Sequence, residues 1–170
     1  DPTVLLFFLA HLKEESPLLL RERTTWDTNL EEGIYWAARL FEKNLERFPE
    51  RRAVPRGVVV ISDGGVLSGK LENSVERLKK IGDVPVHVVG VGTTSGGFIP
   101  ESEKYFDGKK IHWSIDRVSL QRIAALGGGR YFELGVEPDK DIAVKIIQDI
   151  QRRRTSAPDA GKREEIYEAR

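Results

Sequence analysis

An aspartate at the end of a β-branched run is the residue best placed to do chemistry. Asp63 follows the stretch 57–62 (GVVVIS) and precedes Gly64. Such a run predicts a central strand buried on both faces of a parallel sheet, and ligands of open α/β sheets bind where strands end. A carboxylate at that position can hold a hard cation directly or through water. The alternative is a plain turn, because Asp-Gly favours turns through local hydrogen bonds.

A second oxygen-rich segment is the polar loop 24–29 (TTWDTN), which leads into a strong helical pattern. Thr28 or Asp27 is expected to be the N-cap of that helix, because short polar side chains accept hydrogen bonds from the first turn. A hydroxyl at a helix N-terminus near a strand-end aspartate is also what an oxygen-rich cation site uses. The residues by themselves leave both interpretations open.

Other chemical motifs are incomplete or missing from the sequence. The stretch 90–97 (GVGTTSGG) follows a predicted strand, but no helix begins within it to present amides to a pyrophosphate, which argues against nucleotide binding. No H-E-x-x-H, G-x-S-x-G or P-loop pattern occurs. The absence of cysteine excludes disulfides, thiolate zinc sites and cysteine nucleophiles. We therefore expect a protein that is not an enzyme.

The charge balance argues against nucleic acid as a partner. The chain of 170 residues carries 27 Lys+Arg and 27 Asp+Glu, a formal net charge of zero, whereas phosphate binding needs a basic excess or patch. The basic triplet 152–154 is interpreted as a solvated helix end, with a juxtamembrane stretch as the alternative. Residues 1–153 are expected to form one domain, and 154–170 a polar linker or tail.

Helical and strand patterns alternate along the chain. We predict helices over 3–13, 30–48, 71–81, 118–126 and 139–153, strands over 57–62, 84–91 and 130–134, a glycine cap at 127–129, and an irregular segment over 93–114. In the last helix, Ile142, Ile146, Ile147 and Ile150 are expected to face inward. This alternation predicts an α/β fold, a doubly wound Rossmann-like parallel sheet flanked by helices.

Four segments in this order resemble the von Willebrand factor A (VWA) domain. They are 28–34 (TNLEEGI), 58–64 (VVVISDG), 85–92 (PVHVVGVG) with 97–100 (GFIP), and 120–132 (LQRIAALGGGRYF). The last two are similar to the bacterial membrane-anchored branch, which includes Bat aerotolerance-type proteins and VWA proteins encoded near MoxR-type AAA+ ATPases. The resemblance covers residues 1–153. The tail 164–170 (EEIYEAR) resembles the stretch before that branch's C-terminal membrane helix.

The resemblance implies a metal-ion-dependent adhesion site (MIDAS) that binds Mg²⁺, or Mn²⁺ or Ca²⁺. Thr28 matches the threonine of the family's second loop and Asp63 the aspartate of its third. The D-x-S-x-S element of the first loop does not occur in this chain, so the site is incomplete here. The chain lacks methionine and opens on Asp1-Pro2. We therefore expect an N-terminally truncated domain whose first strands are missing.

The same family order places the strand 58–62 beside the missing first strand. An unpaired apolar edge invites association. We expect this edge to be covered by upstream chain, by a second copy in a homodimer, or by a swapped segment.

The resemblance also implies a function. It predicts a Mg²⁺-dependent protein-interaction module that assists assembly or stress tolerance with a MoxR-type ATPase or related VWA proteins. It further implies anchoring in the bacterial inner membrane by segments outside this chain, with the domain extracytoplasmic, although the arginine triplet argues for the other side. Two alternatives remain: a metal-independent scaffold that binds through residues 93–114, and a small α/β hydrolase that uses Asp63 as a general base or metal ligand.

Overall fold

The computed structural model describes residues 29–64, 71–99, 102–104 and 106–155, with four helical positions near the N-terminus (residues 3, 6, 7 and 10). These four agree with the predicted helix 3–13, most of which lies outside the described residues. The elements in chain order are α2 (Leu30–Arg47), η1 (Pro49–Ala53), β1 (Val58–Ser62), α3 (Leu71–Gly82), β2 (Val86–Gly90), β3 (Gly97–Phe98), η2 (Ser102–Lys104), β4 (His112–Trp113), α4 (Arg117–Leu126), β5 (Gly128–Glu133) and α5 (Asp139–Thr155).

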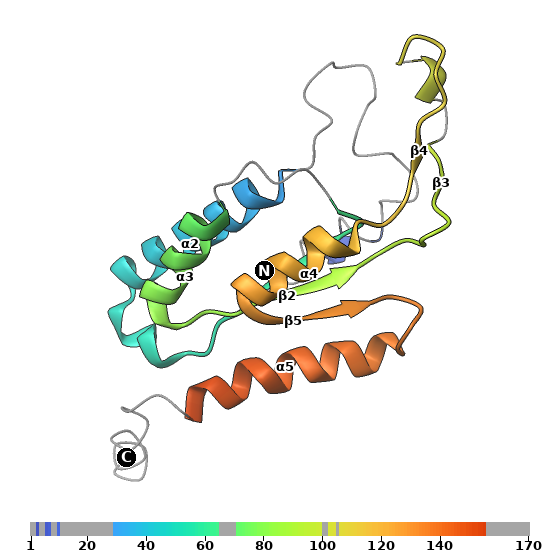
Figure 1. The fold of residues 1–170 in the computed structure, drawn as a ribbon. Helices are drawn as coiled ribbons and strands as arrows, with labels where there is room; N and C mark the ends of the chain where they lie inside the picture. The colour runs from blue at the N-terminus through green and yellow to red at the C-terminus, as the bar shows by residue number, and fades with distance from the viewer. Residues whose placement is uncertain are drawn as a thin grey trace.

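The described sheet has three parallel strands in the order β1-β2-β5. Helices α2, α3 and α4 cover one face, and α5 lies against the other (Figure 1). This arrangement confirms the predicted Rossmann-like α/β fold. None of the helices that the structure describes combines the length and the apolar content needed to cross a lipid bilayer.

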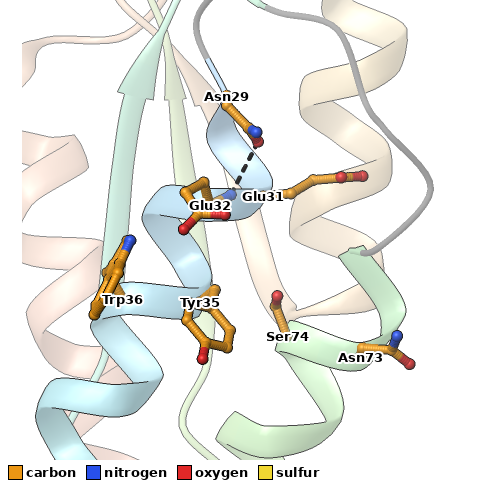
Figure 2. A pocket seen from close by; sticks show the side chains of 7 residues that line it. All are labelled: Asn29, Glu31, Glu32, Tyr35, Trp36, Asn73 and Ser74. Atoms are coloured by element: carbon orange, nitrogen blue, oxygen red, sulfur yellow. Dashed lines mark hydrogen bonds between the residues drawn. The ribbon is translucent and has the colours of Figure 1, made fainter.

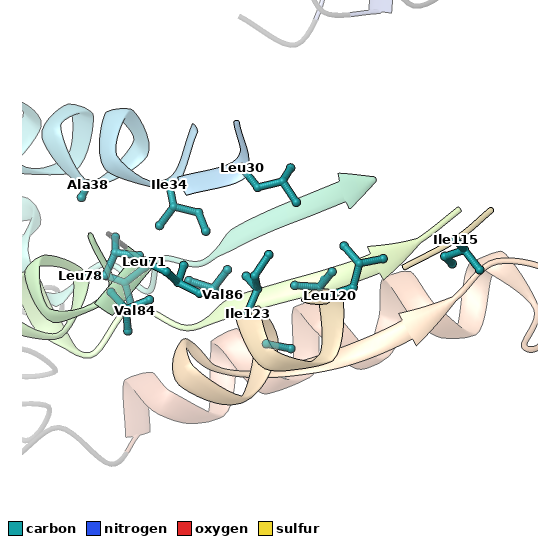
Figure 3. Packing of buried hydrophobic residues seen from close by; sticks show 13 residues of the cluster. Leu30, Ile34, Ala38, Leu71, Leu78, Val84, Val86, Ile115, Leu120 and Ile123 are labelled. Atoms are coloured by element: carbon teal, nitrogen blue, oxygen red, sulfur yellow. The ribbon is translucent and has the colours of Figure 1, made fainter. Parts of the chain in front are cut away.

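The larger core lies between the sheet and the helices α2, α3 and α4 (Figure 3). Side chains at helical spacing fill it from each helix, because positions three and four apart share one face. Its fully buried members include Ile34, Leu78, Val86, Leu120 and Ile123. Partly buried side chains, such as Phe41 of α2, pack against the margin of this core.

A second, smaller core joins α5 to the opposite face of the sheet. It contains Val89, Phe132, Ile142 and Ile146. The buried His87 side chain also lies on this face of β2, and its Nδ1 accepts a hydrogen bond of 3.2 Å from the Arg130 N–H. Ile147, which was predicted to face inward, is 53% exposed, because α5 turns only a narrow stripe toward the sheet.

Strand β5 begins at Gly128, two residues earlier than the sequence predicted. The glycines were expected to cap α4, but Gly129 belongs to the strand and lies tightly against β2. A Cβ at Gly129 would lie 2.1 Å from the Val86 carbonyl oxygen. Glycine is required there because the two backbones approach too closely for any side chain.

Strand β1 was predicted to be buried on both faces, and this prediction is wrong for the described part of the chain. Val58 and Val60 pack against the larger core, whereas Val59 is 44% and Ile61 67% exposed. Among the described residues, β1 pairs only with β2, and α5 covers β2 and β5. A β-branched run indicates strand propensity, but burial depends on which other elements pack beside it.

Two local predictions also require correction. The N-cap of α2 is Asn29, whose Oδ1 accepts a hydrogen bond of 3.0 Å from the Glu32 N–H, rather than Thr28 or Asp27. The segment 93–114 is not wholly irregular, because it contains the antiparallel strands β3 and β4. Strands of two residues are too short to produce the alternating pattern by which sequence analysis finds them.

The core predicts which leucine substitutions destabilise the fold. Leu78→Ala leaves a cavity at a fully buried position and should lower the free energy of unfolding by about 2–5 kcal/mol. Leu40→Ala, at a leucine that is 67% exposed, is the matched control and should change it by about 0.5 kcal/mol or less. Urea denaturation followed by circular dichroism measures both. Equal losses for the two variants would contradict the packing described.

Candidate functional site

A groove of about 600 Å³ opens where β1 and β2 end and the β3–β4 hairpin begins. Its walls come from three parts of the chain: the end of β1, the loop after β2, and the inner side of the hairpin. The lining residues are Ile61, Ser62, Asp63, Val91, Gly92, Thr93, Gly96, Gly97, Trp113, Ser114 and Ile115. The groove thus lies at the edge of the sheet that the sequence predicted for ligand binding.

Asp63 lies at the rim of this groove on a fixed backbone. Its carbonyl oxygen accepts a hydrogen bond of 2.8 Å from the Asp116 N–H. The Ser62 hydroxyl accepts from the Gly64 N–H at 3.1 Å and donates to the Gly64 carbonyl at 3.0 Å. The residue Asp63 itself is exposed. The turn therefore orients a solvated carboxylate, in agreement with both the turn and the ligand-binding interpretations of the sequence.

Gly64 is required by the shape of the turn. Its φ of +126° is a conformation that side-chain-bearing residues rarely adopt. In addition, a Cβ at this position would lie 2.7 Å from the Asp116 Cβ. The close contact brings the end of β1 against the start of α4.

Thr28, the other predicted metal ligand, lies outside the described residues, so its position relative to Asp63 remains a prediction. The described part of the chain contains no group of three or more His, Cys, Asp or Glu side chains that could hold a metal ion. Asp116 is near Asp63, but its Oδ1 caps α4 by accepting from the Ser119 N–H at 3.1 Å. The described residues therefore provide a single solvated carboxylate in the groove, which does not form a complete cation site.

The hairpin arm formed by β3 and β4 exposes aromatic and apolar side chains. Phe98 is 65% exposed and contacts the His112 ring edge to face, with centroids 5.1 Å apart. Trp113 lies opposite Gly97 and is 43% exposed. Exposed aromatic groups on a projecting arm are typical of protein-binding surfaces. The segment 93–114 was predicted to be a binding loop in the metal-independent alternative, but no local sequence pattern distinguishes these rings.

The lining of the groove combines apolar side chains with a single charged group, the Asp63 carboxylate. Ile61 is 67% exposed and Val91 37%, and both line the groove beside Trp113. Asp63 is the only charged side chain among the described lining residues. This composition, with anchors around a lone carboxylate, suits a partner surface that supplies apolar contacts and one complementary polar group.

An ion-paired cluster, which was not predicted from the sequence, joins α4 to the end of β5. Arg117 donates from Nε to Glu133 Oε2 at 2.7 Å and from Nη2 to Oε1 at 2.5 Å. The Tyr131 hydroxyl donates to Glu133 Oε2 at 2.9 Å. Arg117 directly follows Asp116, which holds the Asp63 carbonyl. The cluster therefore stabilises the segment that supports the groove, and no sequence spacing rule would have linked residues 16 positions apart.

The protonation states in this cluster follow from its hydrogen bonds. Hydrogen bonding from Arg117 lowers the pKa of Glu133 to about 2, with a further contribution from the Tyr131 hydroxyl. Burial raises the pKa of Tyr131 to about 12, and the hydrogen bond to Glu133 adds to the effect. At neutral pH the cluster thus consists of a carboxylate, a guanidinium and a neutral phenol.

Comparisons with known proteins agree with this fold. No family model matches the chain, and no curated protein matches it. An aerotolerance-related membrane protein from Bacteroides fragilis matches with 25% identity and a TM-score of 0.62, over 86% of this chain and 69% of that chain. The conserved hypothetical protein BatB from Bacteroides thetaiotaomicron matches with 23% identity and a TM-score of 0.61, over the same shares. The chain is similar to Bat-type proteins.

The Glu133 cluster predicts a dependence of stability on pH. The folded-state pKa lies below the ordinary value of 4.5, so the ion pair stabilises the fold above that pH. This contribution should disappear as the pH falls from 4.5 toward about 2. The difference in unfolding free energy between the wild type and Glu133→Gln should therefore be constant near neutrality and shrink in acid. Urea denaturation at several pH values measures it.

Glu103→Gln is the matched control for this prediction, because Glu103 is an exposed residue of the hairpin arm. Its difference from the wild type should be near zero at every pH. A difference for Glu133→Gln that stays constant down to the acid limit would show that the Arg117 pair does not form in solution.

Proposed function

We propose that this chain is a non-enzymatic protein-interaction module that binds a partner protein in the groove at the ends of β1 and β2. The observation that carries the proposal is the exposure of two large apolar side chains, Ile61 and Trp113, in the lining of one groove. Apolar anchors in a pocket, surrounded by polar groups, are the usual energetic centre of a protein interface.

The same groove gives little support to catalysis. Its described lining has the hydroxyl groups of Ser62, Thr93 and Ser114, but no histidine, cysteine or lysine. The Ser62 hydroxyl is engaged with the backbone of Gly64. A hydroxyl nucleophile needs a base within hydrogen-bond reach, and the described lining offers only Asp63. A hydrolase that uses Asp63 is therefore the less favoured function, and the turnover assay below tests it.

The likeness to aerotolerance-related membrane proteins supports a more specific proposal for the domain type, its location and its partner. In that version the chain is part of a VWA domain that is anchored in a bacterial inner membrane and faces the extracytoplasmic side. Its partner is a MoxR-type AAA+ ATPase or a related VWA protein, and the pair assists assembly or stress tolerance. The four sequence segments that resemble the VWA domain support this assignment.

The proposal also includes a divalent cation bound at Asp63 and Thr28. Asp63 and Thr28 would supply a carboxylate and a hydroxyl to Mg²⁺, Mn²⁺ or Ca²⁺, and the remaining ligands would come from water or from residues outside the described part of the chain. Such an ion, once bound, would supply positive charge for a carboxylate of the partner. With a single carboxylate among the described lining residues, the site would be mostly water-ligated and weak.

A metal-independent scaffold is the second candidate, and the hairpin arm favours it. Phe98 and Trp113 offer aromatic contacts that need no ion. The two candidates differ in one observable property, because only the first loses its partner when divalent cations are removed.

Calorimetric titration with Mg²⁺ and Mn²⁺ tests the ion. We expect saturable binding by the wild type and a loss of affinity of about 10-fold or more in Asp63→Asn, because a carboxylate ligand is removed. Asp141→Asn, at an exposed aspartate on α5, is the matched control and should bind as the wild type does. Absence of binding in all three proteins would contradict the cation and leave the metal-independent scaffold.

Capture of a purified MoxR-type ATPase from the same organism tests the groove. Trp113→Ala should weaken binding by about 10- to 100-fold, because truncating a tryptophan anchor costs roughly 2 kcal/mol. Val136→Ala, at a valine that is 73% exposed outside the groove, is the control and should bind normally.

The same capture assay separates the candidate functions. Loss of binding in a chelator supports the ion-dependent module, and binding that resists the chelator supports the scaffold. Equal capture by Trp113→Ala and Val136→Ala would contradict the groove as the binding surface. Turnover of a model ester or phosphoester that disappears in Asp63→Asn would overturn the non-enzymatic proposal.

A further inference from the structure

A second pocket, of about 510 Å³, lies between the N-terminal halves of α2 and α3. We call it the α2/α3 pocket, and none of its described residues lines the groove. Figure 2 shows Tyr35 between the two helices, Trp36 and Glu32 toward one side, and Ser74 with Asn73 on the other. Its described lining residues are Asn29, Glu31, Glu32, Tyr35, Trp36, Asn73 and Ser74.

The described lining of this pocket is acidic, and Glu32 is its exposed carboxylate, because Glu31 is only 2% exposed. Glu31 and Glu32 are the charged residues of its described lining, and no lysine, arginine or histidine is among them. A helix N-terminus ordinarily attracts anions, but here the first turn of α2 already carries these two carboxylates, and Asn29 caps the Glu32 N–H. The pocket therefore favours a cation over an anion.

Aromatic rings beside the carboxylate provide a surface for a cation–π interaction. Tyr35 and Trp36 meet edge to face, with centroids 5.5 Å apart and planes at 78°. Trp36 is 60% exposed, and tryptophan is the side chain whose face attracts cations most strongly. An exposed indole next to a carboxylate can stack on a planar cation while the carboxylate forms charge-assisted hydrogen bonds with it.

The molecule already holds one guanidinium in this way beside the pocket. Arg77 Cζ lies 5.2 Å from the centroid of the Tyr35 ring. The Arg77 Nε also donates to Glu42 Oε1 at 3.1 Å. An arginine from α3 thus bridges an aromatic ring and a carboxylate of α2. The α2/α3 pocket offers the same two kinds of group, Trp36 and Glu32, without a basic residue in its described lining.

We propose that the α2/α3 pocket binds an arginine side chain of a partner protein. The guanidinium stacks on Trp36 and pairs with the Glu32 carboxylate, and the polar side chains of Asn73 and Ser74 line the opposite wall. Arginine fits better than lysine because its planar fork can stack and hydrogen-bond at the same time. The proposal is independent of the groove and of any cation there.

The test uses the whole chain and two pentapeptides, acetyl-Gly-Gly-Arg-Gly-Gly-amide and the same peptide with citrulline in place of arginine. Citrulline keeps the planar shape but lacks the charge. Heteronuclear NMR follows the Trp36 indole N–H, assigned by its loss in Trp36→Leu. We expect the arginine peptide to shift this signal with a dissociation constant on the order of 1 mM, and citrulline to bind about 10-fold more weakly.

The Glu32→Gln variant removes the charge with little change of shape and should weaken arginine binding by about 3- to 10-fold. Trp36→Leu, followed through backbone amide shifts of α2 and α3, should weaken it by a similar factor. Glu46→Gln, at an exposed glutamate farther along α2, is the matched control and should leave binding unchanged. Added salt at 0.5 M should weaken binding, because screening reduces attraction between exposed charges.

Three outcomes would overturn the proposal. Equal affinity for both peptides would show that charge is not recognised. Equal loss in Glu32→Gln and Glu46→Gln would show diffuse attraction to the helix instead of a site. Absence of any shift of the Trp36 signal at peptide concentrations of tens of millimolar, on the order of ten times the expected dissociation constant, would show that the pocket takes no arginine.

Discussion

The central strand β2 imposes the main constraint on this fold. All five of its residues are buried, and it pairs with β1 on one side and β5 on the other. Backbone N–H and C=O groups in such a position must be hydrogen-bonded within the protein, so both neighbours have to pair with β2. Strand β1 pairs in continuous register, and β5 pairs with a register shift between Val86 and Val88. Gly129 allows the β5 backbone to approach the Val86 carbonyl closely enough for this pairing. The helices then pack on the faces that this pairing creates.

The groove follows from the same pairing. Because the strands are parallel, β1 and β2 end at one edge, and the loops after them meet there. The Asp63 carbonyl is held by Asp116, and the next residue, Arg117, pairs with Glu133 at the end of β5. Hydrogen bonds to charged groups are stronger than neutral ones. The edge is therefore supported by a backbone hydrogen bond at the end of β1 and by a side-chain ion pair at the end of β5.

The groove and the α2/α3 pocket differ in chemistry. The groove presents apolar anchors around one carboxylate, whereas the pocket presents the Glu32 carboxylate beside the exposed Trp36 ring. The overall net charge of zero conceals this difference. Partners are attracted by local fields within about 10 Å, not by the total charge of a chain, so two surfaces of one neutral protein can select different groups on a partner.

Much of the fold and part of the site could be predicted from local sequence patterns. Helical periodicity predicted α2, α3 and α4 to within a residue or two, and the run VVVIS followed by Asp-Gly predicted both β1 and the position of Asp63 at its end. These features depend on residues that are close in the chain, where side-chain spacing reflects the period of the backbone.

Only the tertiary structure decided what covers each element and which distant residues meet. It exposed Ile61 on a strand that composition had assigned to the interior, and it brought Trp113 into the lining of the same groove. It also joined Arg117 to Glu133, and it brought α2 beside α3 to form the second pocket. No local pattern encodes these contacts, because each depends on the packing of segments that are far apart in the chain.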